Sequence, residues 1–122
     1  EKNTKIFVRN IWNPFDRENE KVIGCTTVNR LYITPLGDVL ACPYVHIKVG
    51  NVIEQSLKEI VEFGFSIKHF SDHSPVCLAG ENTEFVKNYM SNFGQTIFRP
   101  ADAKKIFKNE DFLDKDKVKI AY

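Results

Sequence analysis

The sequence predicts a small α+β domain: a β-hairpin or short sheet followed by two or three helices, with cysteines carried on loops. Three observations support this class. An alternating stretch turns back on itself through Pro-Leu-Gly at residues 35–37, two later segments carry helical apolar patterns, and the cysteines lie at or beyond the ends of these segments. With 122 residues, of which 43% are hydrophobic and 27% charged, the chain suits one compact domain with a true core.

The first twenty residues are expected to be a lead-in from an upstream domain. The chain opens on Glu1 rather than Met, and its first ten residues are mixed and charged. A short strand is predicted at residues 5–8. Trp12 and Phe15 flank a turn and are large enough to need a partner surface.

The hairpin is the clearest predicted element. Residues 28–34 alternate, and Pro35 presets the backbone angle φ that the first turn position requires. Gly37 can then adopt the left-handed conformation that closes the turn. The return strand, residues 39–41, is expected to end at Cys42, because Pro43 removes a hydrogen-bond donor from the ladder.

Helices are predicted after the hairpin. Ser56 followed by Glu59 is a capping-box pattern, which starts a helix that Gly64 is expected to end. A second helix is predicted over residues 83–93, with an apolar stripe on one side. A short third helix is predicted to begin within residues 99–102 and to run through Phe107, followed by a charged, loosely attached end with Phe112 and Leu113 as anchors.

Charge and hydropathy exclude several classes of partner. The net charge is +1 and no long block of like charge occurs, so neither a nucleic acid nor an anionic membrane is expected as a partner. No run of about 20 apolar residues is present, and the mixed, charged first ten residues do not resemble a signal peptide. Three cysteines are an odd number for a disulfide-stapled secreted domain, so we expect a reducing cytoplasm.

The cysteines form the candidate site. Cys25 and Cys42 bracket the hairpin, whereas Cys77 lies in a segment that Pro75 and Gly80 mark as irregular backbone. Iron–sulfur clusters take thiolates from such loops and gain from nearby N–H and hydroxyl donors, in this sequence Thr26, Thr27 and Ser74. Their number alone favours buried structural cysteines, and the spacing around Gly37 is what favours a cluster.

At this point the sequence resembles a known family. Residues 25–44 look like the opening of the SPASM and Twitch domains, in which a first cysteine is followed by a spacer, a glycine, four residues and a second cysteine. The segment around Gly50 and Asn51 is similar to the Gly-Asn segment of that family. Residues 77–85 resemble the region that carries its later cluster cysteines.

The resemblance implies a function and a set of ligands. It implies one [4Fe–4S] cluster held by Cys25, Cys42 and Cys77, in an auxiliary domain of a radical S-adenosylmethionine enzyme. It places that domain at residues 21–95, with residues 96–122 as a helical and charged tail. The partners it implies are the catalytic barrel of the same polypeptide, which would bind the S-adenosylmethionine, and a substrate of unknown class. Anchoring that substrate or relaying electrons is then the expected role, without turnover by this chain alone.

The sequence also departs from the family pattern. A full SPASM domain has a later cysteine-dense run with C-x2-C, which is absent from this chain, so one cluster is expected, closer to the Twitch form. Three thiolates leave one iron without a ligand. The fourth ligand is expected from the barrel, from the substrate, or from His73, Asp72 or Glu81.

An alternative function is a small interaction module that is either zinc-stabilised or metal-free. His69, His73 and Cys77 are spaced four apart, and on a continuous helix they would share one face and bind zinc together with Cys25 or Cys42. Pro75 and the polar pair at residues 71–72 argue against such a helix.

Overall fold

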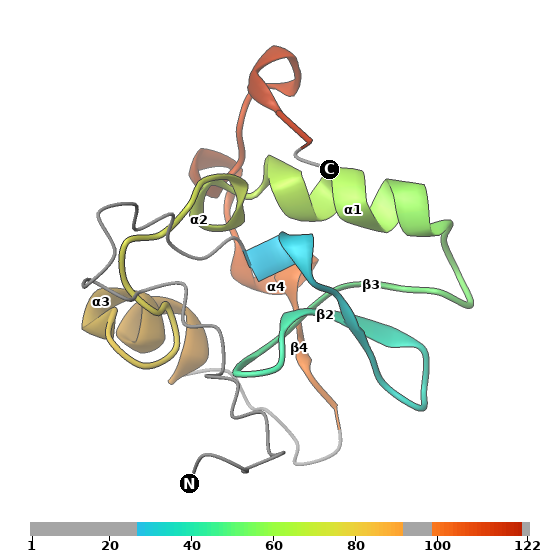
Figure 1. Cartoon of the computed structure of the whole chain (residues 1–122), viewed down its shortest axis with the longest axis horizontal. Helices are drawn as coiled ribbons and strands as arrows, with labels where there is room; N and C mark the ends of the chain where they lie inside the picture. Colours follow the sequence, from blue (N-terminus) through green and yellow to red (C-terminus); the bar gives the residue numbers. More distant parts are fainter. Residues whose placement is uncertain (1–26, 92–98, 121–122) are drawn as a thin grey trace, which may run out of the picture.

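The computed structural model describes residues 27–91 and 99–120, which form an α+β arrangement. A four-stranded sheet has the order β1-β2-β3-β4, and along the chain several helices separate its third strand from its fourth. Helix α1 packs against β3 (Figure 1). The predicted fold class is therefore confirmed. The predicted strand at residues 5–8 and the aromatic turn at residues 12–15 lie outside the described residues.

The predicted hairpin is confirmed. Strands β1 (Tyr32–Ile33) and β2 (Asp38–Cys42) are antiparallel, with Tyr32 opposite Leu40. Gly37 has a φ of 82°, the left-handed conformation that the turn requires. The first strand is shorter than predicted, because Thr27–Asn29 forms the 3-10 helix η1 instead of strand.

A third strand was missed and a fourth was predicted to be helix. Strand β3 (Val45–Asn51) returns after a tight turn at residues 43–44, and alternate side chains along it are buried. Strand β4 (Ala101–Asp102) pairs with β3 in parallel. The predicted third helix therefore begins later, as α4 (Ala103–Ile106), because the Asp102 carboxylate caps it by accepting from Lys104 N at 3.0 Å.

Helix α1 (Leu57–Ser66) starts with the predicted capping box, in which Ser56 and Glu59 bond to each other's backbone. The predicted stop at Gly64 is wrong. The helix continues for two more residues, and Gly64 serves instead as a contact, since a Cβ there would lie 2.9 Å from Val28 Cγ1. Gly50 has a similar role on β3, where a Cβ would lie 2.6 Å from Ile60 Cγ1.

The remaining helices are short. Helix α2 (Lys68–Ser71) follows α1, and a loop leads to α3 (Thr83–Phe85) and the π-helix η2 (Val86–Met90). The predicted second helix begins where expected, but its last turn within the described residues is π rather than α. None of the helices described is long and apolar enough to cross a membrane.

The predicted loose tail is wrong for the part that the structure describes. The 3-10 helices η3 (Asn109–Asp111) and η4 (Lys115–Lys117) lie on either side of Phe112, which bridges to Ile67, and Leu113 N donates to Ser66 O at 2.8 Å. Phe112 also packs on Phe63, with ring centroids 5.8 Å apart. The anchor expected at Phe112 is confirmed.

Candidate iron–sulfur site

Cys42 lies where the sequence predicted, at the carboxyl end of β2. It pairs with Val45 across the tight turn at residues 43–44, so the hydrogen-bonded hairpin fixes the direction of its backbone. Its thiol is free and half-buried, and its side chain packs on the edge of the hydrophobic core. A half-buried thiol at the end of a hydrogen-bonded strand is a suitable metal ligand. Its backbone is already ordered, so metal binding does not have to order it.

Cys77 lies in the loop between α2 and α3, on irregular backbone as predicted. Its carbonyl oxygen accepts from the N–H groups of Glu81 and Asn82 at 2.9 and 3.0 Å, and its own N–H donates to Glu81 Oε2 at 2.9 Å. Its thiol is also free and half-buried. Buried Leu78 anchors the loop to the core, so this cysteine is held in place by both packing and hydrogen bonds.

The backbone beside Cys77 offers free donors. Within the described residues, the N–H groups of Leu78, Ala79 and Gly80 donate to no acceptor. Gly80 lies beside the sulfur, since a Cβ there would be 3.6 Å from Cys77 Sγ, an ordinary contact distance. Unused N–H groups next to a thiol suit the negative charge of a thiolate-ligated cluster.

The third predicted ligand, Cys25, lies outside the described residues, as does Thr26. Of the other two predicted hydroxyl donors, Ser74 is already engaged, because its Oγ donates to Val76 O at 2.5 Å. Thr27 is different: it is 6% exposed, and its Oγ1 has no hydrogen-bond partner in the described part of the chain.

The three candidates for a fourth ligand differ in position. Asp72 and His73 are exposed on the loop after α2. Glu81 folds back over the Cys77 loop, where its Oε2 accepts the Cys77 N–H. Glu81 is therefore the candidate whose hydrogen bonds tie it to a predicted ligand.

The zinc grouping of His69, His73 and Cys77 is not formed. Helix α2 ends at Ser71, so these residues do not share one helical face. His69 instead packs among aromatic rings, and its Nε2 lies 3.5 Å from Asp111 Oδ1. In residues 27–91 and 99–120, no three His, Cys, Asp or Glu side chains are gathered in a way that could hold a metal ion.

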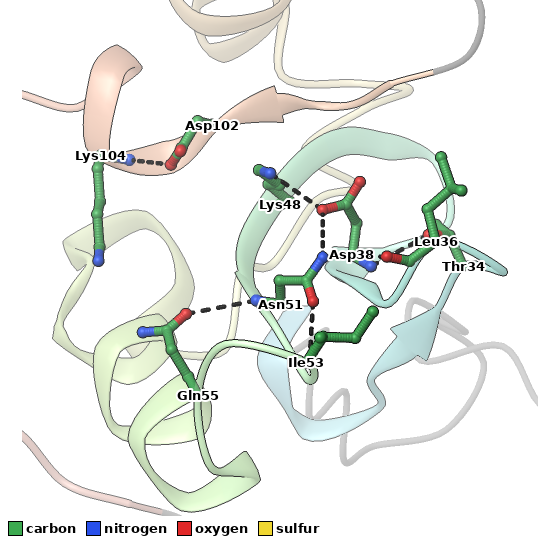
Figure 2. A network of polar contacts seen from close by, with 9 residues as sticks. All are labelled: Thr34, Leu36, Asp38, Lys48, Asn51, Ile53, Gln55, Asp102 and Lys104. Atoms are coloured by element: carbon green, nitrogen blue, oxygen red, sulfur yellow. Dashed lines mark hydrogen bonds and ion pairs between the residues drawn. The ribbon is translucent and has the colours of Figure 1, made fainter.

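A polar network that the sequence did not predict supports the hairpin (Figure 2). Asp38 is buried, and its Oδ1 accepts from Lys48 Nζ at 3.0 Å and from Asn51 Nδ2 at 3.1 Å. Burial alone would raise the pKa of Asp38, but these bonds and the positive charges of Lys48 and Arg99 hold it below its usual value. The Gly-Asn segment that resembles the family thus has a structural role, and that resemblance was the one signal pointing to it.

A second set of contacts that the sequence did not predict joins the segment around Asp111 to the helices. Tyr89 Oη donates to Asp111 Oδ1 at 2.7 Å, and the rings of Tyr89 and His69 lie 4.8 Å apart. Burial, the bond to Asp111 and the nearby carboxylates of Glu110 and Glu84 raise the pKa of Tyr89 to about 12. The same hydrogen bond helps to fix the segment around Asp111, which the sequence suggested only as a charged tail.

The region that holds the three cysteines matches a known protein family. The family model for SPASM, described as an iron-sulfur cluster-binding domain, matches residues 25–79. The match begins at Cys25 and ends two residues beyond Cys77, so it spans all three cysteines. No curated protein and no solved structure matches the chain significantly. Over residues 25–79 the chain is therefore similar to the SPASM iron–sulfur cluster-binding domain.

Proposed function

We propose that this domain holds one [4Fe–4S] cluster through Cys25, Cys42 and Cys77, as the auxiliary cluster of a radical S-adenosylmethionine enzyme. The SPASM match, whose limits enclose the three thiols, is the observation that carries the proposal. The catalytic barrel would belong to the same polypeptide and would bind the S-adenosylmethionine. The 122-residue sequence itself contains no C-x3-C-x2-C motif of the kind that binds the cleaving cluster.

The described residues fit such a cluster. Cys42 and Cys77 are free thiols on fixed backbone, and neither is sealed in the core. The N–H groups of residues 78–80 and the Thr27 hydroxyl are donors that find no acceptor among the described residues. A cluster bound at this site would supply either an electron relay or an iron atom that anchors the substrate.

The chain's own residues set the geometry of that site. The β2–β3 hairpin orients Cys42, and the hydrogen bonds between Glu81 and Cys77 orient the Cys77 loop. The fourth iron, which has no cysteine ligand, would be bound by a group of the barrel, by the substrate or by Glu81. Of the three local candidates, we favour Glu81, because its carboxylate already contacts the Cys77 backbone.

Anaerobic reconstitution with iron and sulfide tests the cluster. We expect brown protein with broad visible absorption and about four irons per chain. Cys42→Ala and Cys77→Ala should each lose most of the iron, whereas Lys87→Ala, an exposed change in η2, should retain it. Colourless protein that keeps one zinc after dialysis would contradict the proposal and support a zinc-stabilised interaction module.

The radical context needs a separate test. The reconstituted chain, supplied with S-adenosylmethionine and a strong reductant, should form no 5′-deoxyadenosine. Formation of this product by the chain alone would contradict the accessory role while leaving the cluster assignment intact.

A further inference from the structure

Thr27 carries a buried hydroxyl that the described part of the fold leaves unpaired. The residue is 6% exposed, and among residues 27–91 and 99–120 its Oγ1 has neither a donor nor an acceptor within reach. Buried hydroxyls are nearly always hydrogen-bonded, because an unmade bond costs the full penalty of removing the group from water. An exception in a folded protein therefore calls for a partner beyond these residues.

The position of Thr27 is fixed from three sides. Helix η1 packs against β2, α1 and α2. Val28, the residue after Thr27, is 2% exposed. It lies so close to Gly64 of α1 that a Cβ at Gly64 would not fit. The backbone that carries Thr27 is thus held by the core, and the Thr27 side chain is buried.

Thr27 is close in the sequence to one proposed ligand, and its helix packs on the strand that carries another. Thr27 comes two residues after Cys25, so a span of about 7 Å bounds the distance between their Cα atoms. The strand on which η1 packs is β2, whose last residue is Cys42. Ser74, near Cys77, shows the contrast, because its hydroxyl is used within its own turn.

The other buried polar atom without a partner in the described residues is Asp38 Oδ2. Asp38 is the first residue of β2 and Cys42 the last, so Asp38 lies about 13 Å along the strand from the cysteine. Its other carboxylate oxygen is bonded to Lys48 and Asn51. Asp38 therefore belongs to the hairpin network and is too far along the strand to contact a sulfur beside Cys42.

We infer that the Thr27 hydroxyl is a positioning and tuning group that donates a hydrogen bond to a sulfide of the cluster. This inference rests on the proposed function. A donor to sulfur stabilises the reduced cluster, which carries more negative charge, over the oxidised one. Thr27 therefore raises the reduction potential of the cluster.

The test compares Thr27→Val, which keeps the shape of the side chain and removes the hydroxyl, with Thr27→Ser, which keeps the donor. All three proteins are reconstituted anaerobically with iron and sulfide, their iron is counted, and their potentials are measured by redox titration. We expect equal iron content. At a fixed potential, the reduced-to-oxidised ratio should fall about three- to tenfold in Thr27→Val, or about 30–60 mV for one electron. Thr27→Ser should stay near the unchanged protein.

Thermal unfolding of the cluster-free chain gives an independent readout. Because the hydroxyl lacks its sulfur partner there, Thr27→Val should melt at the same temperature as the unchanged protein or higher. A lower melting temperature with an unchanged potential would show a purely structural role and overturn the inference. A loaded Thr27→Val protein with an unchanged potential overturns it while the proposed function stands. An unchanged protein that binds no cluster overturns both.

Discussion

At the scale of single residues, Asn51 connects three parts of the sheet through one side chain (Figure 2). Its Nδ2 donates to Leu36 O in the β1–β2 turn and to Asp38 Oδ1, both at 3.1 Å, while its Oδ1 accepts from Ile53 N at 2.8 Å. A single amide thus uses both donor hydrogens and its acceptor oxygen. Because these bonds hold the hairpin that carries Cys42, Asn51 supports the site without lying in it.

Asn51→Ala should therefore weaken the hairpin. The change leaves Ile53 N without its acceptor and Asp38 with Lys48 as its remaining partner in this network, so we expect a loss of about 1–3 kcal/mol in the free energy of unfolding. Urea denaturation of the cluster-free chain measures it. Glu54→Ala, an exposed change in the same turn, is the control and should fall within about 0.5 kcal/mol of the unchanged protein. Equal stability of the two variants would show that the network contributes little.

Residues whose role depends on the local backbone conformation were predictable from the sequence. Residues whose role depends on how two strands align were not. Gly37 and Cys42 were placed correctly, because a turn and a proline specify them locally. The ion pair of Asp38 and Lys48 depends on how β2 aligns with β3, and this pairing has irregularities on both sides of Leu40. No sequence pattern specified that alignment, so the buried carboxylate was missed.

At the scale of elements, the contact between η1 and α1 helps to determine where Thr27 lies. Gly64 was predicted to end a helix, since glycine after an apolar pattern is a common stop signal. In the structure it lies inside α1, where its missing side chain lets Val28 approach. Glycine was therefore required at this position for the contact with Val28 and not for ending the helix.

Gly64→Ala is expected to displace η1. In an exposed helix this change would stabilise the protein, because alanine favours helix. At this contact the new Cβ would lie 2.9 and 3.0 Å from the two γ-carbons of Val28, so we expect a net loss of about 1–3 kcal/mol and a lower iron content after reconstitution. Lys58→Ala, an exposed change in the same helix, is the control and should keep both the stability and the iron content. Higher stability of Gly64→Ala with full iron content would contradict this role of the contact.

The strands at the far side of the sheet show the limits of pattern reading. Residues 45–51 do alternate, yet β3 was missed because the turn before it is only Pro43 and Tyr44. Strand β4 has two residues, Ala101 and Asp102, and exists only because β3 offers an edge for parallel pairing. Such a strand has no signature of its own.

At the scale of the whole molecule, residues 109–113 pack against the core and are not a loosely attached tail. Phe112 packs on Phe63 of α1, and Tyr89 of η2 holds Asp111. The sequence showed a charged tail, because charge is a property of single residues. Its attachment depends on a buried carboxylate, and burial cannot be read from composition.

This attachment should make the stability depend on pH in both directions. Burial alone would raise the pKa of Asp111, but its bonds from Lys108 N, Tyr89 and His69 hold it below its usual value. A carboxyl with a lowered pKa stabilises the fold above its unfolded value of about 4. That contribution is lost as the pH falls through the lower, folded value. For Tyr89 the pKa is raised to about 12, so its contribution is complete below about pH 10 and is lost towards pH 12.

Tyr89→Phe isolates this link, because it removes the hydroxyl and keeps the ring packing. We expect the variant to be less stable near pH 7 and to lose less further stability than the unchanged protein between about pH 10 and 12, since no phenol titrates at that position. The measurement is the urea midpoint of the cluster-free chain as a function of pH. Lysines also titrate in that range, so the difference between the two profiles is the quantity to compare. Tyr44→Phe changes an exposed phenol and should leave the profile unaltered. If Tyr89→Phe kept the full alkaline loss, the hydrogen bond to Asp111 would not be what couples the chain end to the helices.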